Sequence, residues 1–340
     1  MTETKKKEDT WQAIRGICII AVVLIHCKSY NLEGISVGNT FYLIYRNLIS
    51  FPVAIFFFLS GHFVHIREGY KDWLKARALK LVIPYFFWTL VYSVINLFLD
   101  HEMVTFKGVF EVLLLGKAAV PFYYCVVLIY YTLLTPLLIR LSRYRVASCL
   151  VCILSLSIQF IGYLLQSRGI GFFADYMRYT PVWLPFYYFG IKSRDFRSVF
   201  PHYSLQKIIP YLLAGSFALQ LVETIILAST IELSPIAFSQ MRVSSFCYSL
   251  SLLLFLTEVF RNKAAQRWLC FIGDCSYGIF FIHFLFIAFS SRVLSHYPII
   301  LPLYILIEAV TSIIGSIFLI QFLRKISKRN NYIRIVLGVG

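Results

Sequence analysis

The stretch from Trp11 to Tyr30 reads WQAIRGICIIAVVLIHCKSY, and it decides the fold of this chain. As a helix with a rise of about 1.5 Å per residue, it is long enough to cross a hydrocarbon layer about 30 Å thick. It also contains Arg15 near its start and His26 near its end, which a plain anchor does not need. Their spacing places both side chains on one helix face, about 16 Å apart along the axis. Polar groups are unfavourable inside a membrane and imidazole exchanges protons near neutral pH, so this face is a candidate site.

The composition of the whole chain indicates an integral membrane protein. Of its 340 residues, 59% are hydrophobic and only 14% are charged. We predict an all-α bundle of about ten transmembrane helices that forms one domain over residues 1–340, with short tails at 1–10 and 325–340. The apolar windows cover residues 11–30, 41–66, 79–100, 121–141, 146–166, 178–194, 207–230, 237–260, 269–293 and 298–324. The sixth window is short, and residues 109–115 form a weaker apolar segment that suits a surface or re-entrant helix.

The net charge of +16 comes from basic residues that alternate from loop to loop, which argues against a nucleic-acid-binding patch. Most of them lie in residues 5–7, 67–80, 140–145, 192–207, 261–267 and 324–334. The positive-inside rule then predicts that both termini are cytoplasmic, which requires an even number of spans. We therefore expect a multi-pass protein of the inner cell membrane with lipids, and no nucleic acid, as partners.

Two further features of the sequence concern processing and metals. Trp11–Tyr30 is long and lacks a small-residue cleavage site, so we expect this first helix to be retained. The eight cysteines lie mostly within the apolar windows, where thiols behave as small hydrophobic groups. Cys149 and Cys152 have CxxC spacing but no second pair, so we expect no metal site.

Four stretches resemble, in the same order, the motifs of the membrane-bound acyltransferase family 3. They are RGICIIAVVLIH at 15–26, FFFLSG at 56–61, RALKLVIPYFFW at 77–88 and FIGDCSYGIFFIH at 271–283. The resemblance spans most of the chain. It implies an O-acyltransferase that moves an acetyl or other small acyl group from cytosolic acetyl-CoA to a hydroxyl of a cell-envelope glycan or its lipid-linked precursor. Some relatives carry a partner domain, so this chain either acts alone, uses a separate protein or forms a homo-oligomer.

The resemblance also implies roles for the polar residues of the first and third stretches. His26 is expected to be the catalytic base, or to carry the acyl group itself in a two-step variant. Arg15 lies at the predicted cytoplasmic boundary, where it is expected to hold a donor phosphate while the pantetheine arm runs towards His26. Arg77 and Lys80 are expected to bind further phosphate groups. Lys80 stands where relatives have a second arginine, and it supplies a point charge in place of a guanidinium fork.

The second and fourth stretches supply candidate lining residues. Ser60 and Gly61 either shape the donor tunnel or let a neighbouring helix approach closely. Ser276 and His283 share one face of the ninth window, with Tyr277 beside it. The resemblance makes this face part of the site, and helix packing is the alternative. Ser276 or Tyr277 is also a candidate donor to the oxyanion.

Other polar residues are candidates for acceptor contacts. Asp175 and Arg178 lie in the external loop before the sixth window, close to aromatic residues, and could bind glycan hydroxyls. Glu223 and Glu308 are carboxylates within apolar windows. They could orient the catalytic imidazole, contact the acceptor or pair with Arg242.

Two other functions stay open at this point. A transporter that exports a glycan or small metabolite would use buried His and Glu residues as a proton relay or for binding. The sequence has no paired broken helices in matching halves, which disfavours a transporter. A non-catalytic scaffold would make His26→Ala harmless to acyl transfer.

Overall fold

The apolar segments fold into helices because backbone groups inside a membrane must hydrogen-bond within their own segment. The computed structural model describes residues 3–27, 40–66, 69–100, 106–172, 176–193, 202–262 and 266–339, and these contain no β-strand. The long helices are α1 (Glu3–His26), α4 (Tyr70–Asp100), α6 (Tyr123–Leu141), α7 (Arg145–Ser167), α10 (His202–Ser229), α11 (Val243–Asn262), α12 (Arg267–Leu294) and α13 (Leu301–Ile326). The shorter helices are α2 (Thr40–Leu48), α3 (Pro52–His62), α5 (Phe106–Leu115), α9 (Leu184–Lys192) and α14 (Asn331–Leu337). The 3₁₀ turns are η2 (Val120–Phe122), η3 (Met177–Tyr179), η4 (Pro181–Trp183), η6 (Ser234–Ile236) and η7 (Ser327–Arg329).

Within the described ranges, nine helical segments are long and apolar enough to span a membrane, which confirms an all-α integral membrane bundle. They match every predicted window except the sixth. Residues 178–194 instead contain η3, η4 and the nine-residue α9. Helices α3 and α9 meet at their C-terminal ends, where His62 Nδ1 lies 2.6 Å from Ser193 Oγ. The sixth window is thus a composite segment in which two 3₁₀ turns, one of them beginning with Pro181, replace the first half of a helix.

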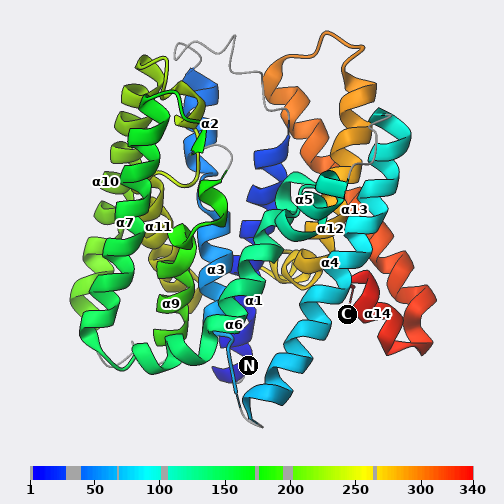
Figure 1. The fold of residues 1–340 in the computed structure, drawn as a ribbon, viewed down its shortest axis with the longest axis horizontal. Coiled ribbons are helices and arrows are strands. Elements are labelled where there is room, and N and C mark those ends of the chain that lie inside the picture. Colours follow the sequence, from blue (N-terminus) through cyan, green and yellow to red (C-terminus); the bar gives the residue numbers. More distant parts are fainter. Residues whose placement is uncertain are drawn as a thin grey trace.

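The helices form a bundle with α1 near its middle (Figure 1). Helices α7 and α10 lie on one flank, and α4 and α13 lie on the other. The flanking helices present large apolar side chains outward: Phe98, Phe160, Tyr211 and Phe318 are between 74% and 79% exposed. Such a broad apolar surface suits contact with lipid tails.

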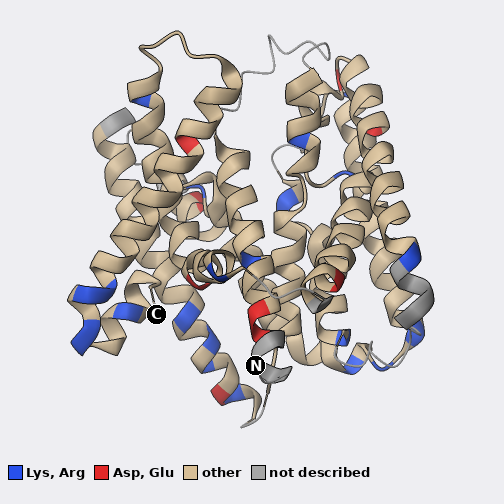
Figure 2. Cartoon of the chain, turned by 180° about the vertical axis from the view of Figure 1, so that it is seen from behind, with Lys and Arg blue, Asp and Glu red and all other residues tan. Residues whose placement is uncertain are grey.

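The basic residues are unevenly distributed over the bundle. Figure 2 shows most Lys and Arg residues in the lower half of the view, which also contains both chain ends. This distribution agrees with the alternation in the sequence, and the cytoplasmic orientation of this end stays a prediction.

Helices α1 and α12 pack backbone to backbone. A Cβ atom on Gly16 would lie 2.3 Å from the carbonyl oxygen of Leu269, and one on Gly273 would lie 2.0 Å from that of Gln12. Any side chain at either position would force the helices apart, so only glycine fits. This contact brings the first and fourth motif stretches together.

Helices α3 and α9 use a second reciprocal pair of glycines. A Cβ atom on Gly61 would lie 2.1 Å from the carbonyl oxygen of Tyr187, and one on Gly190 would lie 2.1 Å from that of Phe58. Gly61 therefore allows close helix packing, which was the alternative to a role in the donor tunnel.

The chain after residue 324 folds back under the bundle. Trp88 on α4 donates its indole N–H to the carbonyl of Leu337 on α14 at 3.1 Å. Arg324 Nε donates to the carbonyl of Val339 at 2.8 Å. The predicted tail at 325–340 is thus, over residues 325–339, the end of α13 followed by η7 and α14, packed against α4.

Candidate active site

A cavity of about 470 Å³ lies beside α1 and is walled by residues of α1, α2, α3, α4, α6 and α12 together with η2, η3 and η4. Most of the predicted site residues line it. These are Arg15, His26, Ser60, Arg77, Lys80, Arg178, Ser276 and Tyr277. In the described part of the chain no Asp or Glu lines this cavity, so its fixed charges are all positive.

Arg15 and His26 both face the cavity, as their spacing predicts. The guanidinium of Arg15 donates to Gln12 Oε1 at 3.3 Å, and its carbon lies 4.6 Å from the centre of the Phe63 ring. This cation–π contact and the hydrogen bond hold the positive charge in the wall about midway along α1.

At the Arg15 end the cavity adjoins a second one of about 490 Å³. Arg15, Ser276 and Tyr277 line both, and the second also contains Asp274 and Arg324. Together with the basic face of α4, this end forms a cationic mouth on the side of the chain ends. We use "cationic mouth" below for Arg15, Arg77, Lys80 and Arg324.

Hydroxyl groups that line the first cavity link the helices of its wall by hydrogen bonds. Tyr277 donates to the carbonyl of Lys80 at 2.7 Å, which links α12 to α4. Ser60 Oγ lies 2.9 Å from the hydroxyl of Tyr124, and both residues line the cavity. Since the Tyr277 hydrogen is already used, it is poorly suited to donate to an oxyanion.

His26 and His283 meet at the other end of the shared face. Their ring centres are 5.5 Å apart, and the ring of Phe284 lies 5.8 Å from His26. His283 Nδ1 lies 2.9 Å from the carbonyl oxygen of Ile279, so Nδ1 carries the hydrogen because a carbonyl can only accept. Its Nε2 is buried without a hydrogen-bond partner in the described structure. His283 is fully buried and does not line the cavity, so it lies behind His26.

The register of α12 separates Ser276 from the imidazoles. Ser276 is seven residues before His283, which is about 10 Å along a helix axis. Ser276 therefore lies nearer the Arg15 end of the cavity, and it is not placed to stabilise an oxyanion beside His26.

Two further arginines, Arg46 and Arg178, line the cavity. Arg46 on α2 donates to the carbonyl of Ile25 at 2.9 Å, one residue before His26. Tyr45 donates to the carbonyl of Leu24 at 2.6 Å. These bonds satisfy carbonyls that the end of α1 leaves open, and a cation there complements the helix dipole. The second arginine, Arg178 on η3, has its guanidinium carbon 5.5 Å from the centre of the Tyr123 ring.

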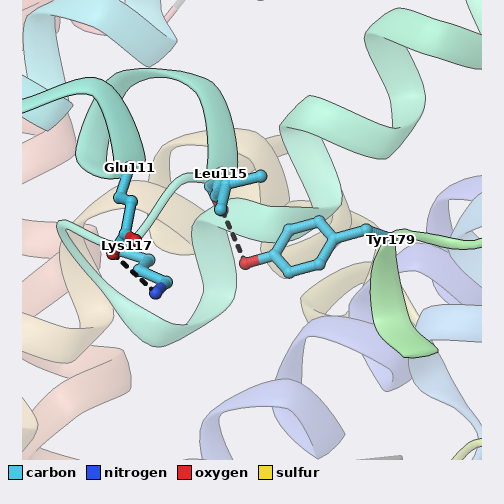
Figure 3. A network of polar contacts seen from close by, with 4 residues as sticks. All are labelled: Glu111, Leu115, Lys117 and Tyr179. Carbon is cyan, nitrogen blue, oxygen red and sulfur yellow. Dashed lines mark hydrogen bonds and ion pairs between the residues drawn. The ribbon is translucent and has the colours of Figure 1, made fainter. Parts of the chain in front are cut away.

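The segment that carries Arg178 is anchored to α5 (Figure 3). The hydroxyl of Tyr179 donates to the carbonyl of Leu115 at 2.7 Å, at the C-terminal end of α5. Beyond it, Lys117 Nζ donates to Glu111 Oε2 at 2.8 Å. This hydrogen bond raises the pKa of Lys117. Helix α5 thus fixes the η3 turn beside the cavity, whereas Lys117 does not line it.

The two predicted acids that the structure describes, Glu223 and Glu308, do not line the cavity. Glu223 accepts from the hydroxyl of Tyr163 at 2.7 Å and from the backbone N–H of Ser244 at 3.0 Å. Glu308 is fully buried and accepts from Ser291 Oγ. Asp175 lies outside the described residues.

Arg242, a suggested partner for the buried acids, serves a neighbouring polar cluster. Its guanidinium donates to Asn47 Oδ1 at 3.0 Å and to Thr224 Oγ1, and its Nε donates to the carbonyl of Ser239 at 2.8 Å. These bonds join α2, α10 and α11. The cluster thus holds these helix ends together, and Arg242 lies near enough to Glu223 for a favourable charge interaction without forming a salt bridge with it in the described structure.

Sequence reasoning missed Arg46 and Arg324. Arg46 is the one Arg or Lys in the apolar window 41–66, and a cation inside such a window is a signal for a site. Arg324 is the last residue of the last apolar window, where it resembles any basic flank. Only the packing of α13 on α12 reveals that it reaches the cationic mouth.

Comparison with known proteins agrees with this geometry. A family model described as an acyltransferase domain, that of acyltransferase family 3, matches residues 9–321. No curated protein and no solved structure matches the chain. The family match covers all nine membrane-spanning segments, wholly or nearly so. The chain therefore belongs to acyltransferase family 3 and is a membrane acyltransferase.

Proposed function

We propose that this protein is an O-acyltransferase of the inner cell membrane. It transfers an acetyl or other small acyl group from cytosolic acyl-CoA to a hydroxyl of a cell-surface polysaccharide or of its lipid-linked precursor. The observation that carries the proposal is one cavity with a cationic mouth at one end and His26 at the other. Arg15 and His26 are about 16 Å apart along α1, so phosphate binding and acyl chemistry are separated as an acyl-CoA requires.

The donor fits this cavity with its charged end at the cationic mouth. Arginine and lysine bind phosphate through charge-assisted hydrogen bonds, and Arg15 supplies a planar fork for it. Between the mouth and His26 the wall is largely apolar, with Val22, Leu81 and Phe280 among its residues. The pantetheine arm would run along this wall and bring the thioester to the imidazole.

His26 would then act as the general base. Its imidazole takes the proton of the acceptor hydroxyl as the hydroxyl oxygen attacks the thioester carbonyl carbon. The C–O bond forms, the C–S bond breaks, and the imidazolium returns the proton to the departing CoA sulfur. In the two-step variant His26 attacks first and carries the acyl group before the acceptor hydroxyl displaces it. Either route gives one ester and one free CoA.

The test is acyl transfer in proteoliposomes that contain the full chain. Labelled acetyl-CoA is supplied on the side of the chain ends and an envelope-glycan extract on the other. We expect label on glycan with wild type and none with His26→Ala. His296→Ala, which removes an exposed histidine outside the cavity, is the matched control and should transfer normally.

The same assay separates the transporter from the enzyme. Movement of glycan across the bilayer without release of CoA would overturn the acyltransferase proposal. Equal transfer by wild type and His26→Ala, at equal folded yield, would remove His26 from the chemistry.

A further inference from the structure

Arg46 is a cation close to His26, and the acyl donor has no negative group that would bind it there. Its bond to the carbonyl of Ile25 fixes it one residue from His26, about 16 Å along α1 from Arg15. The phosphates of an acyl-CoA lie at the opposite end of the pantetheine arm from the thioester. If they occupy the cationic mouth, the donor brings no negative charge to Arg46.

Among the described residues, no Asp or Glu forms an ion pair with Arg46. No Asp or Glu in the described chain lines the cavity, and Arg46 Nε is buried without a hydrogen-bond partner there. Holding a guanidinium at this depth is unfavourable unless a bound group compensates for the lost water. The carbonyl of Ile25 uses one of its five N–H donors, which leaves others for a ligand.

Other side chains that line the cavity also offer hydrogen-bond donors. The indole N–H of Trp183 is a pure donor; this side chain is 1% exposed, lines the cavity and leaves Nε1 without a partner in the described structure. Arg178 brings a second guanidinium to the same wall, held over Tyr123 and by the anchor of Tyr179 on α5 (Figure 3). Two guanidinium groups and an indole N–H therefore line the same cavity as His26.

We infer that the His26 end of the cavity binds an acceptor that carries a negatively charged oxygen group, phosphate or carboxylate, close to the hydroxyl that is acylated. This inference rests on the proposed function, because it assigns the donor phosphates to the cationic mouth. A guanidinium fork binds phosphate and carboxylate alike in a bidentate manner. The phosphate would belong to a lipid-linked glycan precursor, and the carboxylate would belong to an acidic sugar of the polysaccharide.

The experiment compares matched charged and neutral probes on the full chain in nanodiscs of neutral lipid. One pair is oligogalacturonate and oligogalactose, which differ in the carboxylate. The other pair is a polyprenyl phosphate sugar and the same sugar linked directly to polyprenol. Binding is measured by thermophoresis for wild type, Arg46→Gln, Arg178→Gln and the control Lys117→Gln. The control removes a nearby cation that does not line the cavity.

We expect the charged member of at least one pair to bind about ten-fold or more tightly than its neutral match, as a charge-assisted hydrogen bond provides. Arg46→Gln should reduce this preference to about two-fold or less, Arg178→Gln should reduce it less, and Lys117→Gln should keep it. The pair that shows the preference identifies the source of the charge. If Arg46→Gln does not fold, the inference is tested instead by the preference of wild type for the charged probe and by the same measurement on Arg46→Lys.

No preference in either pair with wild type, including no binding at all, would overturn the inference. So would a preference that survives Arg46→Gln. CoA release from acetyl-CoA is followed in parallel, because it tests the proposed function separately. A preference that depends on Arg46, without CoA release, would support the anion site and contradict the proposed acyl transfer. CoA release with equal use of neutral and charged acceptors would support the acyl transfer and contradict the anion site.

Discussion

The imidazole rings of His26 on α1 and His283 on α12 lie 5.5 Å apart between centres, with their planes tilted by 43°. They come from opposite ends of the sequence and meet because glycines let α1 and α12 pack backbone to backbone. His26 faces the cavity, whereas His283 is fully buried behind it. Since His283 Nδ1 donates to Ile279, its Nε2 can only accept while the ring is neutral. No hydrogen bond joins the two rings in the described structure, and we propose that Nε2 of His283 accepts one from His26 once that imidazole is protonated.

Replacing His283 should therefore slow transfer without affecting donor binding. We expect His283→Phe to lower kcat about ten- to hundred-fold, the range for a hydrogen bond to a charged group, because that bond would form only when His26 is protonated during transfer. The KM for acetyl-CoA should stay unchanged, because His283 is remote from the cationic mouth. His283→Gln keeps an accepting oxygen and should recover part of the rate. Equal rates for the Phe and Gln variants, or a change confined to folded yield, would reduce His283 to a packing role.

Removing Arg15 should weaken the binding of acetyl-CoA and leave the chemical step unchanged. Arg15→Ala loses a guanidinium at the junction of the two cavities, so the KM for acetyl-CoA should rise about ten-fold or more. Lys80→Ala should raise it less, because lysine binds phosphate as a point charge. Steady-state kinetics at varied acetyl-CoA measure both. Arg143→Ala removes an exposed cation outside the cavity and should behave as wild type; an unchanged KM in Arg15→Ala would remove Arg15 from the phosphate site.

The backbone contact of α1 and α12 predicts a stability effect at Gly273. A Cβ in Gly273→Ala would meet the carbonyl of Gln12 at 2.0 Å, so the helices must separate. We expect a loss of about 1–3 kcal/mol in unfolding free energy, typical of overpacking, together with lower activity because the two histidines move apart. Gly215→Ala is the control, since a Cβ there meets nothing within 4 Å. Denaturation in matched nanodiscs would contradict this account if both variants were equally stable.

The part of the site that could be predicted from the sequence depends on local geometry. Helical periodicity alone places Arg15 and His26 on one face, and the structure brings both to one cavity. The positions of Arg77 and Lys80 follow in the same way from a basic run that enters a long helix. These features need no knowledge of which helices are neighbours.

What could not be predicted depends on contacts between distant segments. Arg46 reaches the His26 end of the cavity because α2 packs across the end of α1. His283 lies behind His26 because two glycines let α1 and α12 pack closely. The sixth window is apolar enough for a span, but its two prolines at 181 and 185 shorten the helix to α9. Helical periodicity does not predict these features, because they depend on which helices pack against each other.

The anchor of Tyr179 on α5 gives a last prediction, which links the fold to the acceptor end. Tyr179→Phe removes the hydrogen bond to the carbonyl of Leu115, and a lost bond of this kind costs about 1 kcal/mol. Because the same turn carries Arg178, the KM for a charged acceptor should rise a few-fold while the KM for acetyl-CoA stays unchanged. Lys117→Ala tests the neighbouring exposed ion pair, which contributes little, and should leave both constants unchanged. If Tyr179→Phe raised the KM equally for charged and neutral acceptors, the turn would shape the cavity without presenting the charge of Arg178.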